Sequence, residues 1–425
     1  MAMRVLKAEI IATGSELLWD GLTETNSVYL ADRLIELGFE PIHKSVVGDE
    51  ERSMTEVIRQ AASRAPVVMI TGGLGPTEDD LTKKVVSRIA GRRLILQEKL
   101  LEPLRKRFEE RAQAMPAQVA RQALMPARST VIPNPTGSAP GLILHWENSY
   151  LICLPGVPYE MRSMYEATVR PFLEQRFPSR LWNELHSFRT YGLMESAVNE
   201  RLADLMIGHR QVRIGLTAKP TGVDVRIVGT GRNKEEVRTL LEGLLQKVEE
   251  RLSDVLYGRG REEMETVVGE LLRDRRMMLA VAESCTGGLI GHRLTQIPGS
   301  SDYLDRVEVC YSNRAKVEAL GVPLDMIEAN GAVSAPVAAA MAQGVRRRAE
   351  TDFGLAVTGI AGPGGGTAEK PVGLVYFGLD DGREVRTTFA RFSGDRSAIK
   401  LRASQHALDL VRRALVGATH APPKR

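Results

Sequence analysis

Pro66-Val-Val-Met-Ile-Thr71 runs directly into Gly72-Gly-Leu-Gly-Pro-Thr77. An apolar run of this length without polar alternation is typical of a strand that is buried on both faces of a parallel sheet. The glycines that follow allow a tight turn into a helix, which we expect to end near Gly91. Ligands of doubly wound sheets lie at the carboxyl ends of the strands, so this turn is a candidate binding loop.

The segments before this junction continue the alternation of strands and helices. Strands are expected at Ala8–Thr13 and at about Ile42–Val47, and Thr25–Leu37 predicts a helix. That helix and the next one are expected to bury these residues: Val28, Ala31, Leu34 and Ile35 in the first, and Met54, Val57, Ile58 and Ala61 in the second. The pattern predicts a doubly wound α/β domain over residues 1–172.

Residues 173–257 predict a small α+β module. Helices are expected at Ser196–Met206 and Lys234–Leu252, and strands at Val212–Leu216 and Val223–Val228. Gly258-Arg-Gly-Arg261 predicts a linker.

Residues 258–425 predict a second α/β domain. It begins with a helix at Met264–Arg275 and a strand at Met277–Ala282. The strand runs into Glu283-Ser-Cys-Thr-Gly-Gly288 and a helix. Further strands and helices alternate up to a last helix from Arg396 to Leu415.

The composition is that of an ordinary globular protein, with 43% hydrophobic and 26% charged residues. The 57 Lys and Arg residues nearly balance the 53 Asp and Glu residues, and the net charge of +4 does not indicate nucleic-acid binding. The three cysteines form no Cys-x-x-Cys pair, and no apolar stretch approaches the roughly 20 residues that span a bilayer. We therefore expect a cytoplasmic protein without a membrane partner.

A candidate phosphate-binding loop follows the buried strand of the first domain. The backbone N–H groups of Gly72, Gly73 and Gly75 can surround an anion at a helix start. Asp79 and Asp80 come next, and carboxylates beside a phosphate suit a bridging divalent cation. The alternative is that the glycines only form a turn and an aspartate only caps the helix.

Two polar residues after the first strand, Glu16 and Asn26, are expected at the same edge of the sheet. Motifs for a zinc protease, a P-loop and a nucleophile elbow are absent from the sequence. His292 and His406 fall in predicted helices, where packing or surface roles are more typical than metal binding.

A candidate nucleophile follows the first strand of the third domain. Ser284 lies where that strand turns into a helix, and two glycines follow shortly after it. Without a histidine in motif position, the base would be a lysine, and Lys316 follows a strand end with Tyr311 just before it. The alternatives are Ser284 as a helix cap, Lys316 as a solvated residue and Tyr311 as a core residue. Cys285 is a competing nucleophile.

A second glycine-rich loop, Gly359–Thr367, is too flexible in composition to be a simple connection. Thr358 precedes it, and Arg396 is expected at a helix start, where it suits a phosphate. The alternative for Arg396 is a surface ion pair.

These motifs make the chain similar to the CinA (competence/damage-inducible) family over nearly its whole length. The first domain resembles the molybdopterin-binding MoaB/MogA type through these segments: Gly14–Leu18, Thr25-Asn26, Val47–Asp49, Thr71–Thr82, Pro133-Asn134, Gly137–Gly141 and Leu154–Met161. The third resembles the PncC type through Ala282–Gly288, Pro298–Ser301, Tyr311–Lys316, Gly331–Ser334, Thr358–Gly366, Glu369–Gly373 and Ser393–Arg396. The middle module resembles a KH-like linker without a convincing Gly-x-x-Gly loop, so no nucleic-acid partner is expected.

For the third domain, the resemblance implies a nicotinamide mononucleotide (NMN) deamidase that needs no cofactor. Ser284 would be the nucleophile, Lys316 its base and Tyr311 an assisting hydroxyl. The implied substrate-binding residues are Thr358, Arg396, Gly359, Gly362, Thr286, Gly287 and Asn313.

For the first domain, the resemblance implies an ADP-ribose pyrophosphatase that depends on a divalent metal. Asp79 and Asp80 would hold the cation, and Gly72, Gly73 and Gly75 the pyrophosphate, with Glu16 and Asn26 nearby. The resemblance also implies a homodimer and leaves open a protein partner in DNA repair. A non-catalytic nucleotide- or pterin-binding scaffold and a role in molybdenum-cofactor assembly are the competing hypotheses.

The chain departs from the usual pattern of this family at four positions. Glu24 stands where Asp is usual before Thr25-Asn26, and Lys400 stands where Arg is common. Glu308 and Cys310 replace apolar or small residues before Tyr311. The Glu24 change bears on the first site, whereas none of the four is part of the expected Ser284–Lys316 pair.

Overall fold

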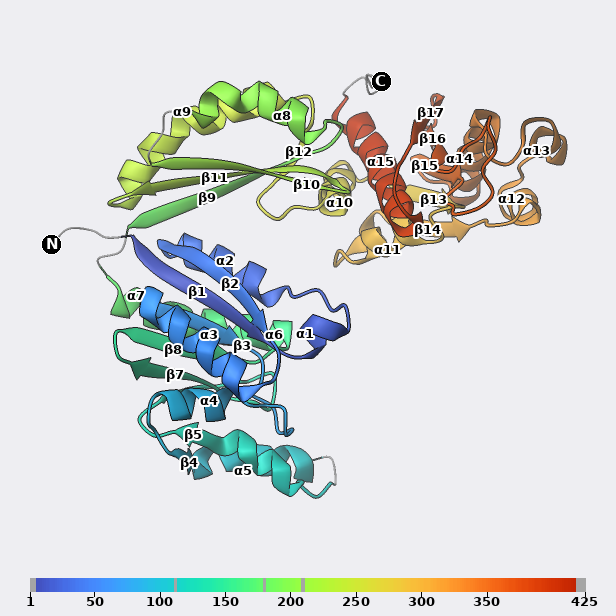
Figure 1. The fold of residues 1–425 in the computed structure, drawn as a ribbon. Coiled ribbons are helices and arrows are strands. Elements are labelled where there is room, and N and C mark those ends of the chain that lie inside the picture. Colours follow the sequence, from blue (N-terminus) through green and yellow to red (C-terminus); the bar gives the residue numbers. More distant parts are fainter. Residues whose placement is uncertain (1–4, 111–112, 179–180, 208–210, 418–425) are drawn as a thin grey trace. The chain divides into compact units, whose positions relative to one another are not determined.

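The computed structural model describes residues 5–110, 113–178, 181–207 and 211–417 (Figure 1). The chain divides into two compact units, Met1–Leu185 with Val228–Gly243, and His186–Ile227 with Leu244–Arg425. Within the described ranges, no helix is both long enough and apolar enough to cross a membrane.

A six-stranded sheet, in the order β2-β1-β3-β8-β7-β6, forms the centre of the N-terminal domain. The strands are β1 (Leu6–Thr13), β2 (Phe39–Val47), β3 (Val67–Thr71), β6 (Thr130–Ile132), β7 (Gly141–Trp146) and β8 (Ser149–Leu154). The first three and β8 are mutually parallel, β7 pairs antiparallel with β8, and β6 pairs antiparallel with β7. The predicted doubly wound α/β fold is confirmed, and four carboxyl ends of strands meet at one edge.

Alternating side chains of these strands face two separate cores. Ile10 and Met69 face one core, and Ile11 and Ile70 face the other. The first core is covered by α2 (Asn26–Glu36), α6 (Pro158–Met164) and α7 (Arg170–Arg176), and the second by α3 (Glu51–Arg64) and α4 (Thr82–Ile89). Shorter elements of this domain are α1 (Glu16–Trp19), β4 (Leu94–Leu96), α5 (Glu98–Glu109) and β5 (Leu124–Pro126).

The buried face of α2 differs from the predicted one. Val28 is 52% exposed, whereas Leu30 and Leu34 are fully buried. The helix begins at Asn26, whose side-chain amide is hydrogen-bonded at the strand ends. Since Leu30 lies one helical turn after Asn26, fixing Asn26 inward turns Val28 toward solvent.

The middle module contains the sheet β10-β11-β9-β12. Its elements are β9 (Trp182–Thr190), α8 (Glu195–Leu202), β10 (Val212–Lys219), β11 (Gly222–Gly231), α9 (Lys234–Leu252) and β12 (Leu256–Arg259). The prediction of a linker from Gly258 onward is wrong at its start. Gly258 and Arg259 pair with β9, so tertiary hydrogen bonding makes a strand of residues with weak intrinsic strand preference.

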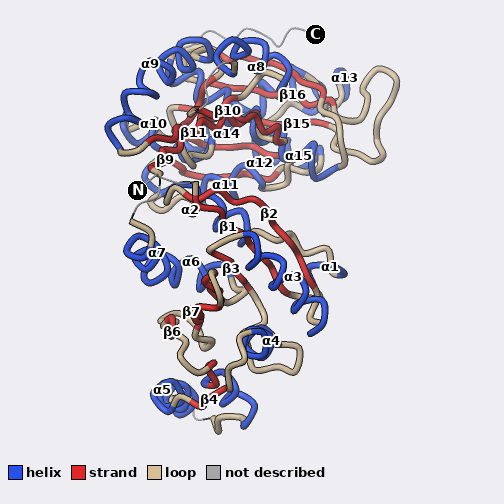
Figure 2. Tube along the Cα trace, turned by 60° about the vertical axis from the view of Figure 1, so that its left-hand side comes forward, coloured by secondary structure: helices blue, strands red, loops and turns tan. Residues whose placement is uncertain are grey.

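The C-terminal domain has a five-stranded sheet in the order β14-β13-β15-β16-β17. Figure 2 draws the strands in red and labels β15 and β16 of this sheet. Strands β13 (Leu279–Glu283), β14 (Leu304–Val309) and β15 (Phe353–Gly359) are parallel, and β16 (Leu374–Asp380) and β17 (Val385–Arg391) are added antiparallel. One core is covered by α10 (Met264–Arg275), α11 (Leu289–Thr295) and α15 (Arg396–Val416). The other is covered by α12 (Asn313–Leu320), α13 (Leu324–Asn330) and α14 (Ala335–Ala349).

Candidate functional site

The candidate nucleophile lies at the carboxyl edge of the C-terminal sheet. Ser284 directly follows β13, and its N–H donates to the carbonyl of Val357 on β15 at 3.0 Å. Its carbonyl accepts from the N–H of Gly287 at 3.1 Å, which closes a turn. Gly287 and Gly288 have φ of 59° and 89°, a left-handed conformation that favours glycine. The turn therefore depends on both glycines.

A buried carboxylate holds this turn in place. Glu283 is fully buried, and its two carboxylate oxygens accept from the N–H groups of Gly288 and Gly291, each at 2.9 Å. Charge-assisted hydrogen bonds of this kind are among the stronger ones in proteins. Glu283 thus fixes the backbone on both sides of the serine loop.

The candidate base reaches the serine directly. Lys316 Nζ lies 3.1 Å from Ser284 Oγ and 2.9 Å from the carbonyl oxygen of Cys310. Lys316 is 1% exposed, so the alternative of a solvated lysine is wrong. Burial disfavours the ammonium form and lowers the pKa of Lys316 below the ordinary lysine value.

Three oxygen atoms surround Lys316 Nζ, the number to which an ammonium can donate, and the same contacts serve the neutral amine once the proton is lost. A neutral amine has two N–H groups and one lone pair. The carbonyls of Cys310 and Tyr311 lie 2.9 and 3.5 Å from Nζ and can take the two N–H groups. The lone pair is then left for the proton of the Ser284 hydroxyl, which is the arrangement that general-base catalysis requires.

Tyr311 and Arg396 form a second group at the same edge. Arg396 donates to the Tyr311 hydroxyl and to the carbonyl of Gly362, each at 2.6 Å. Tyr311 is 60% exposed, so it is not a core residue. The Arg396 side chain therefore links Tyr311 to the second glycine-rich loop, rather than forming a surface ion pair.

The other candidates of this site lie in different surroundings. Thr358 is buried and donates to the carbonyl of Ala332 at 2.9 Å, so its hydroxyl supports a neighbouring loop. Gly359 ends β15 and pairs with β16. Asn313 is exposed at the start of α12. Thr286 is fully buried, and its hydroxyl has no hydrogen-bond partner among the described residues.

The protonation of Cys285 argues against the cysteine as nucleophile. Burial raises the pKa of the Cys285 thiol to about 12, so the thiol is protonated near neutral pH. The thiolate is the reactive form of cysteine.

Replacing Cys285 by alanine is therefore expected to leave kcat within about threefold of the wild type, since no reacting group is lost. The small cavity is expected to cost about 1 kcal/mol of unfolding free energy. Steady-state kinetics of this variant check the expected kcat, and denaturant unfolding checks the expected loss of stability. A loss of activity comparable with that of a Ser284 variant would transfer the nucleophile role to Cys285.

In the N-terminal domain, Asn26 at the start of α2 connects the end of β3 with the loop after β8. Its Nδ2 donates to Thr71 Oγ1 at 2.9 Å and to the carbonyl of Gly156 at 2.7 Å. The Thr71 hydroxyl in turn donates to the carbonyl of Pro155 at 3.0 Å. The Asn26 Oδ1 atom is buried without a hydrogen-bond partner among the described residues. Asn26 therefore offers an unused acceptor at this edge.

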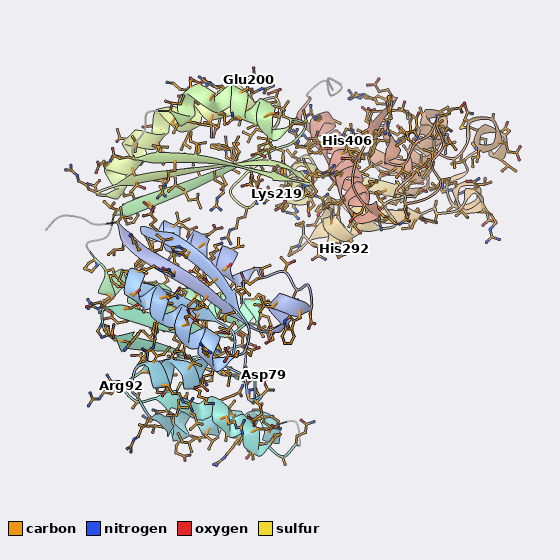
Figure 3. All side chains as sticks on the ribbon, viewed as in Figure 1. Asp79, Arg92, Glu200, Lys219, His292 and His406 are labelled. Carbon is orange, nitrogen blue, oxygen red and sulfur yellow. The ribbon has the colours of Figure 1, made fainter. Side chains whose placement is uncertain are left out.

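Asp80 organises the glycine-rich loop. Its carboxylate accepts from the N–H groups of Gly75 and Thr77 at 2.7 and 2.8 Å, and from the Thr77 hydroxyl. Since α4 begins only at Thr82, Asp80 braces the loop instead of capping the helix. Asp79 is exposed on the same loop (Figure 3), and hydrogen bonding from Thr77 lowers its pKa.

The donor set at this loop suits a divalent cation that also binds substrate. No group of three or more His, Cys, Asp or Glu residues in the described ranges is arranged to hold a metal. A carboxylate has about four lone-pair sites, and Asp80 uses three of them. Asp79 and the remaining site of Asp80 suit an ion such as Mg²⁺, which keeps waters and takes its other ligands from substrate phosphates.

Of the remaining N-terminal candidates, Gly72 and Gly73 lie at the same edge of the sheet, directly after β3. Gly72 and Gly73 have φ of 110° and 63°, and side chains there would collide with Thr13 and Thr82. Glu16 is exposed, and its carboxylate folds back against Gly14. The unusual Glu24 accepts from the N–H of Ser27 at 2.8 Å and so caps the start of α2.

Sequence reasoning missed two buried charged residues. Glu283 was visible in the sequence as the residue next to Ser284, but only burial reveals its role. Lys83 donates to the carbonyl of Gln122 at 2.7 Å, and burial lowers its pKa to about 8. No sequence signal distinguished Lys83 from the solvated Lys84 next to it. The histidines behave as expected, with His292 exposed on α11 and His406 packed on α15 (Figure 3).

Sheet topology and strand-edge residues define an α/β protein with a doubly wound N-terminal domain, a small middle module and a further α/β domain that carries the Ser–Lys pair. Each of these three parts matches a known protein family. Residues 9–175 match the "Probable molybdopterin binding domain", 186–258 the "Damage-inducible protein CinA KH domain" and 261–415 the "CinA C-terminal domain".

Full-length relatives extend these matches. The chain is 41% identical over 409 residues to a competence-damage inducible protein of Caldicellulosiruptor bescii, covering 96% of this chain and 99% of the relative. It is also 41% identical over 413 residues to a CinA-like protein of Dictyoglomus thermophilum, covering 97% of this chain and 100% of the relative. The chain belongs to the CinA family.

Solved structures match single domains. A competence/damage inducible protein from Agrobacterium tumefaciens is 41% identical and covers 36% of this chain and 93% of its own, with a TM-score of 0.35. A CinA protein from Thermoplasma acidophilum is 31% identical and covers 39% of this chain and 98% of its own, with a TM-score of 0.37.

Proposed function

We propose that the C-terminal domain is a nicotinamide-nucleotide amidase, which hydrolyses NMN to nicotinic acid mononucleotide and ammonia. The observation that carries this proposal is the 3.1 Å contact between the buried Lys316 amine and the Ser284 hydroxyl. The similarity of the surrounding motifs to NMN deamidases of the family supports the choice of substrate.

In the proposed reaction, Ser284 Oγ attacks the carboxamide carbon while Lys316 Nζ takes the hydroxyl proton. The protonated Lys316 then gives this proton to the leaving nitrogen, which departs as ammonia and leaves an ester on Ser284. Water hydrolyses the ester by the same route. The backbone N–H of Thr286, two residues after Ser284, would stabilise the oxyanion.

The test is product analysis with the full chain, NMN and excess EDTA. We expect one ammonia and one nicotinic acid mononucleotide per NMN consumed, at a rate that EDTA does not change. Binding of NMN without turnover would instead support the nucleotide-binding scaffold.

For the N-terminal domain, we propose a metal-dependent ADP-ribose pyrophosphatase. The observation that favours it is the loop from Gly72 to Asp80, in which closely packed glycines and two adjacent carboxylates follow the end of β3. A bound divalent cation would neutralise phosphate charge. Asp79 and Asp80 would hold it. The N–H groups of Gly72 and Gly75 already donate to Leu154 and Asp80, so the N–H of Gly73 would orient the pyrophosphate. Molybdopterin binding without ADP-ribose hydrolysis would favour cofactor assembly instead.

Two neighbouring aspartates give a matched pair of variants for this proposal. Asp79→Asn is expected to lower ADP-ribose hydrolysis by about 10- to 100-fold with little change in melting temperature, because Asp79 is exposed and its hydrogen bond with Thr77 stays within the loop. Asp80→Asn is expected to lower both activity and melting temperature, because its carboxylate holds the loop. Hydrolysis assays in Mg²⁺ and thermal unfolding check this. Full activity of Asp79→Asn would contradict the metal assignment.

A further inference from the structure

A lysine ammonium lies beside the turn that carries the candidate nucleophile. A side-chain carbon added to Gly287 would lie 3.5 Å from Lys400 Nζ. Gly287 closes a β-turn with Ser284, so the Cα atoms of the two residues lie within about 7 Å. Lys400 lies one helical turn after Arg396 on α15, and both side chains start from the same face of that helix.

The other cations of this edge are already engaged. Lys316 contacts Ser284 and Cys310, and Arg396 contacts Tyr311 and Gly362. In contrast, the Lys400 ammonium makes no hydrogen bond or ion pair with any residue in the described ranges. The positive charge at this place therefore has no counter-ion among the residues that the structure describes.

The nearby carboxylates do not supply that counter-ion. Glu283 is buried and satisfied by the N–H groups of Gly288 and Gly291. Asp395 accepts from the N–H of Ala398 and caps α15. An anion that reaches Lys400 therefore meets a free ammonium.

The turn beside Lys400 also leaves space. Gly287 and Gly288 carry no side chains, and a carbon added to Gly288 would meet only Val309 at 3.7 Å. A side chain on Gly287 would fill the volume in front of the Lys400 ammonium. The left-handed backbone thus keeps this volume open as well as shaping the turn.

We infer that Lys400 binds the phosphate group of a nucleoside monophosphate substrate at the Ser284 site. This inference rests on the proposed amidase function and predicts that the site prefers nucleotides to nucleosides because of this contact. Lysine is a compact point charge that pairs well with phosphate. Arg396, which the sequence suggested for this role, already donates from both terminal nitrogens to Tyr311 and Gly362, whereas Lys400 has all its N–H groups left for a phosphate.

The test compares NMN with nicotinamide riboside, which has the same carboxamide but no phosphate. In the full chain, Lys400→Met is expected to raise KM for NMN at least 10-fold with kcat within about threefold. The kcat/KM for the riboside is expected to stay within about twofold. Lys400→Arg is expected to recover most of the affinity for NMN. Lys247→Met, which removes an exposed charge on α9, is expected to leave the kinetic constants for both substrates unchanged.

Equal losses on both substrates would overturn the inference, because they would indicate a structural role for Lys400. Unchanged NMN kinetics would overturn it too. If the wild-type chain hydrolysed neither substrate, the amidase proposal itself would fail. Calorimetry with NMN would then test Lys400 alone, with at least 10-fold weaker binding to Lys400→Met supporting the phosphate contact and equal binding refuting it.

Discussion

Replacing Ser284 by alanine is expected to lower ammonia release from NMN by at least about 10³-fold, as for other enzymes that lose their nucleophile. The substitution removes one oxygen atom from a side chain that packs in a turn held by backbone hydrogen bonds and by Glu283. We therefore expect the melting temperature to change by only a few degrees. Ammonia release under saturating NMN and thermal unfolding measure the two effects.

A matched control keeps this result interpretable. Ser312 caps α12 by accepting from the N–H of Ala315, and it takes no part in the proposed chemistry. Ser312→Ala is expected to cost about 1 kcal/mol of stability and little activity. Retained activity in Ser284→Ala, with a folded protein, would remove Ser284 from the mechanism.

Replacing Lys316 by methionine is expected to lower kcat by about 10²- to 10⁴-fold, the usual contribution of a general base. Methionine fills similar volume, but it leaves the Cys310 carbonyl without its donor, which is expected to cost about 1–3 kcal/mol. Lys316→Arg is expected to be inactive as well, because a guanidinium stays protonated. Activity equal to wild type in either variant would contradict the assignment.

The pH profile gives an independent test of the same residue. The base acts only when neutral, and burial lowers the pKa of Lys316. The kcat/KM for NMN is therefore expected to rise with pH through this lowered pKa and to level off before the ordinary lysine value. Between the lowered pKa and about 10.5, the unfolded chain binds more protons at this lysine, so its contribution makes stability rise with pH. A rate that kept rising up to the ordinary lysine pKa would indicate an unperturbed base.

The sequence predicted the architecture well because its signals are local. The buried strand before Gly72 ends at Thr71 as predicted, and the strand before Ser284 ends at Glu283, one residue later than predicted. The glycine-rich turns that follow place polar residues at the sheet edges. The pairing of Ser284 with Lys316 follows from this, since β13 and β14 are neighbours in the sheet and their carboxyl ends coincide.

What the sequence did not reveal depends on tertiary contacts. The hydrogen bonds of Asn26 to distant residues decide which face of α2 is buried. Periodicity alone therefore wrongly predicted that Val28 is buried. Asp80 braces its own loop, although a helix cap was the expected alternative. The burial of Lys316 and the free ammonium of Lys400 are properties of packing, which the spacing of residues along the chain does not encode.

The most direct test of the serine mechanism is mass spectrometry of the full chain, quenched with acid during turnover of NMN and then digested. The mechanism predicts a peptide carrying NMN minus ammonia as an ester on Ser284, and its absence in Ser284→Ala. An adduct on Cys285, or ordinary turnover of NMN by Ser284→Ala, would contradict it.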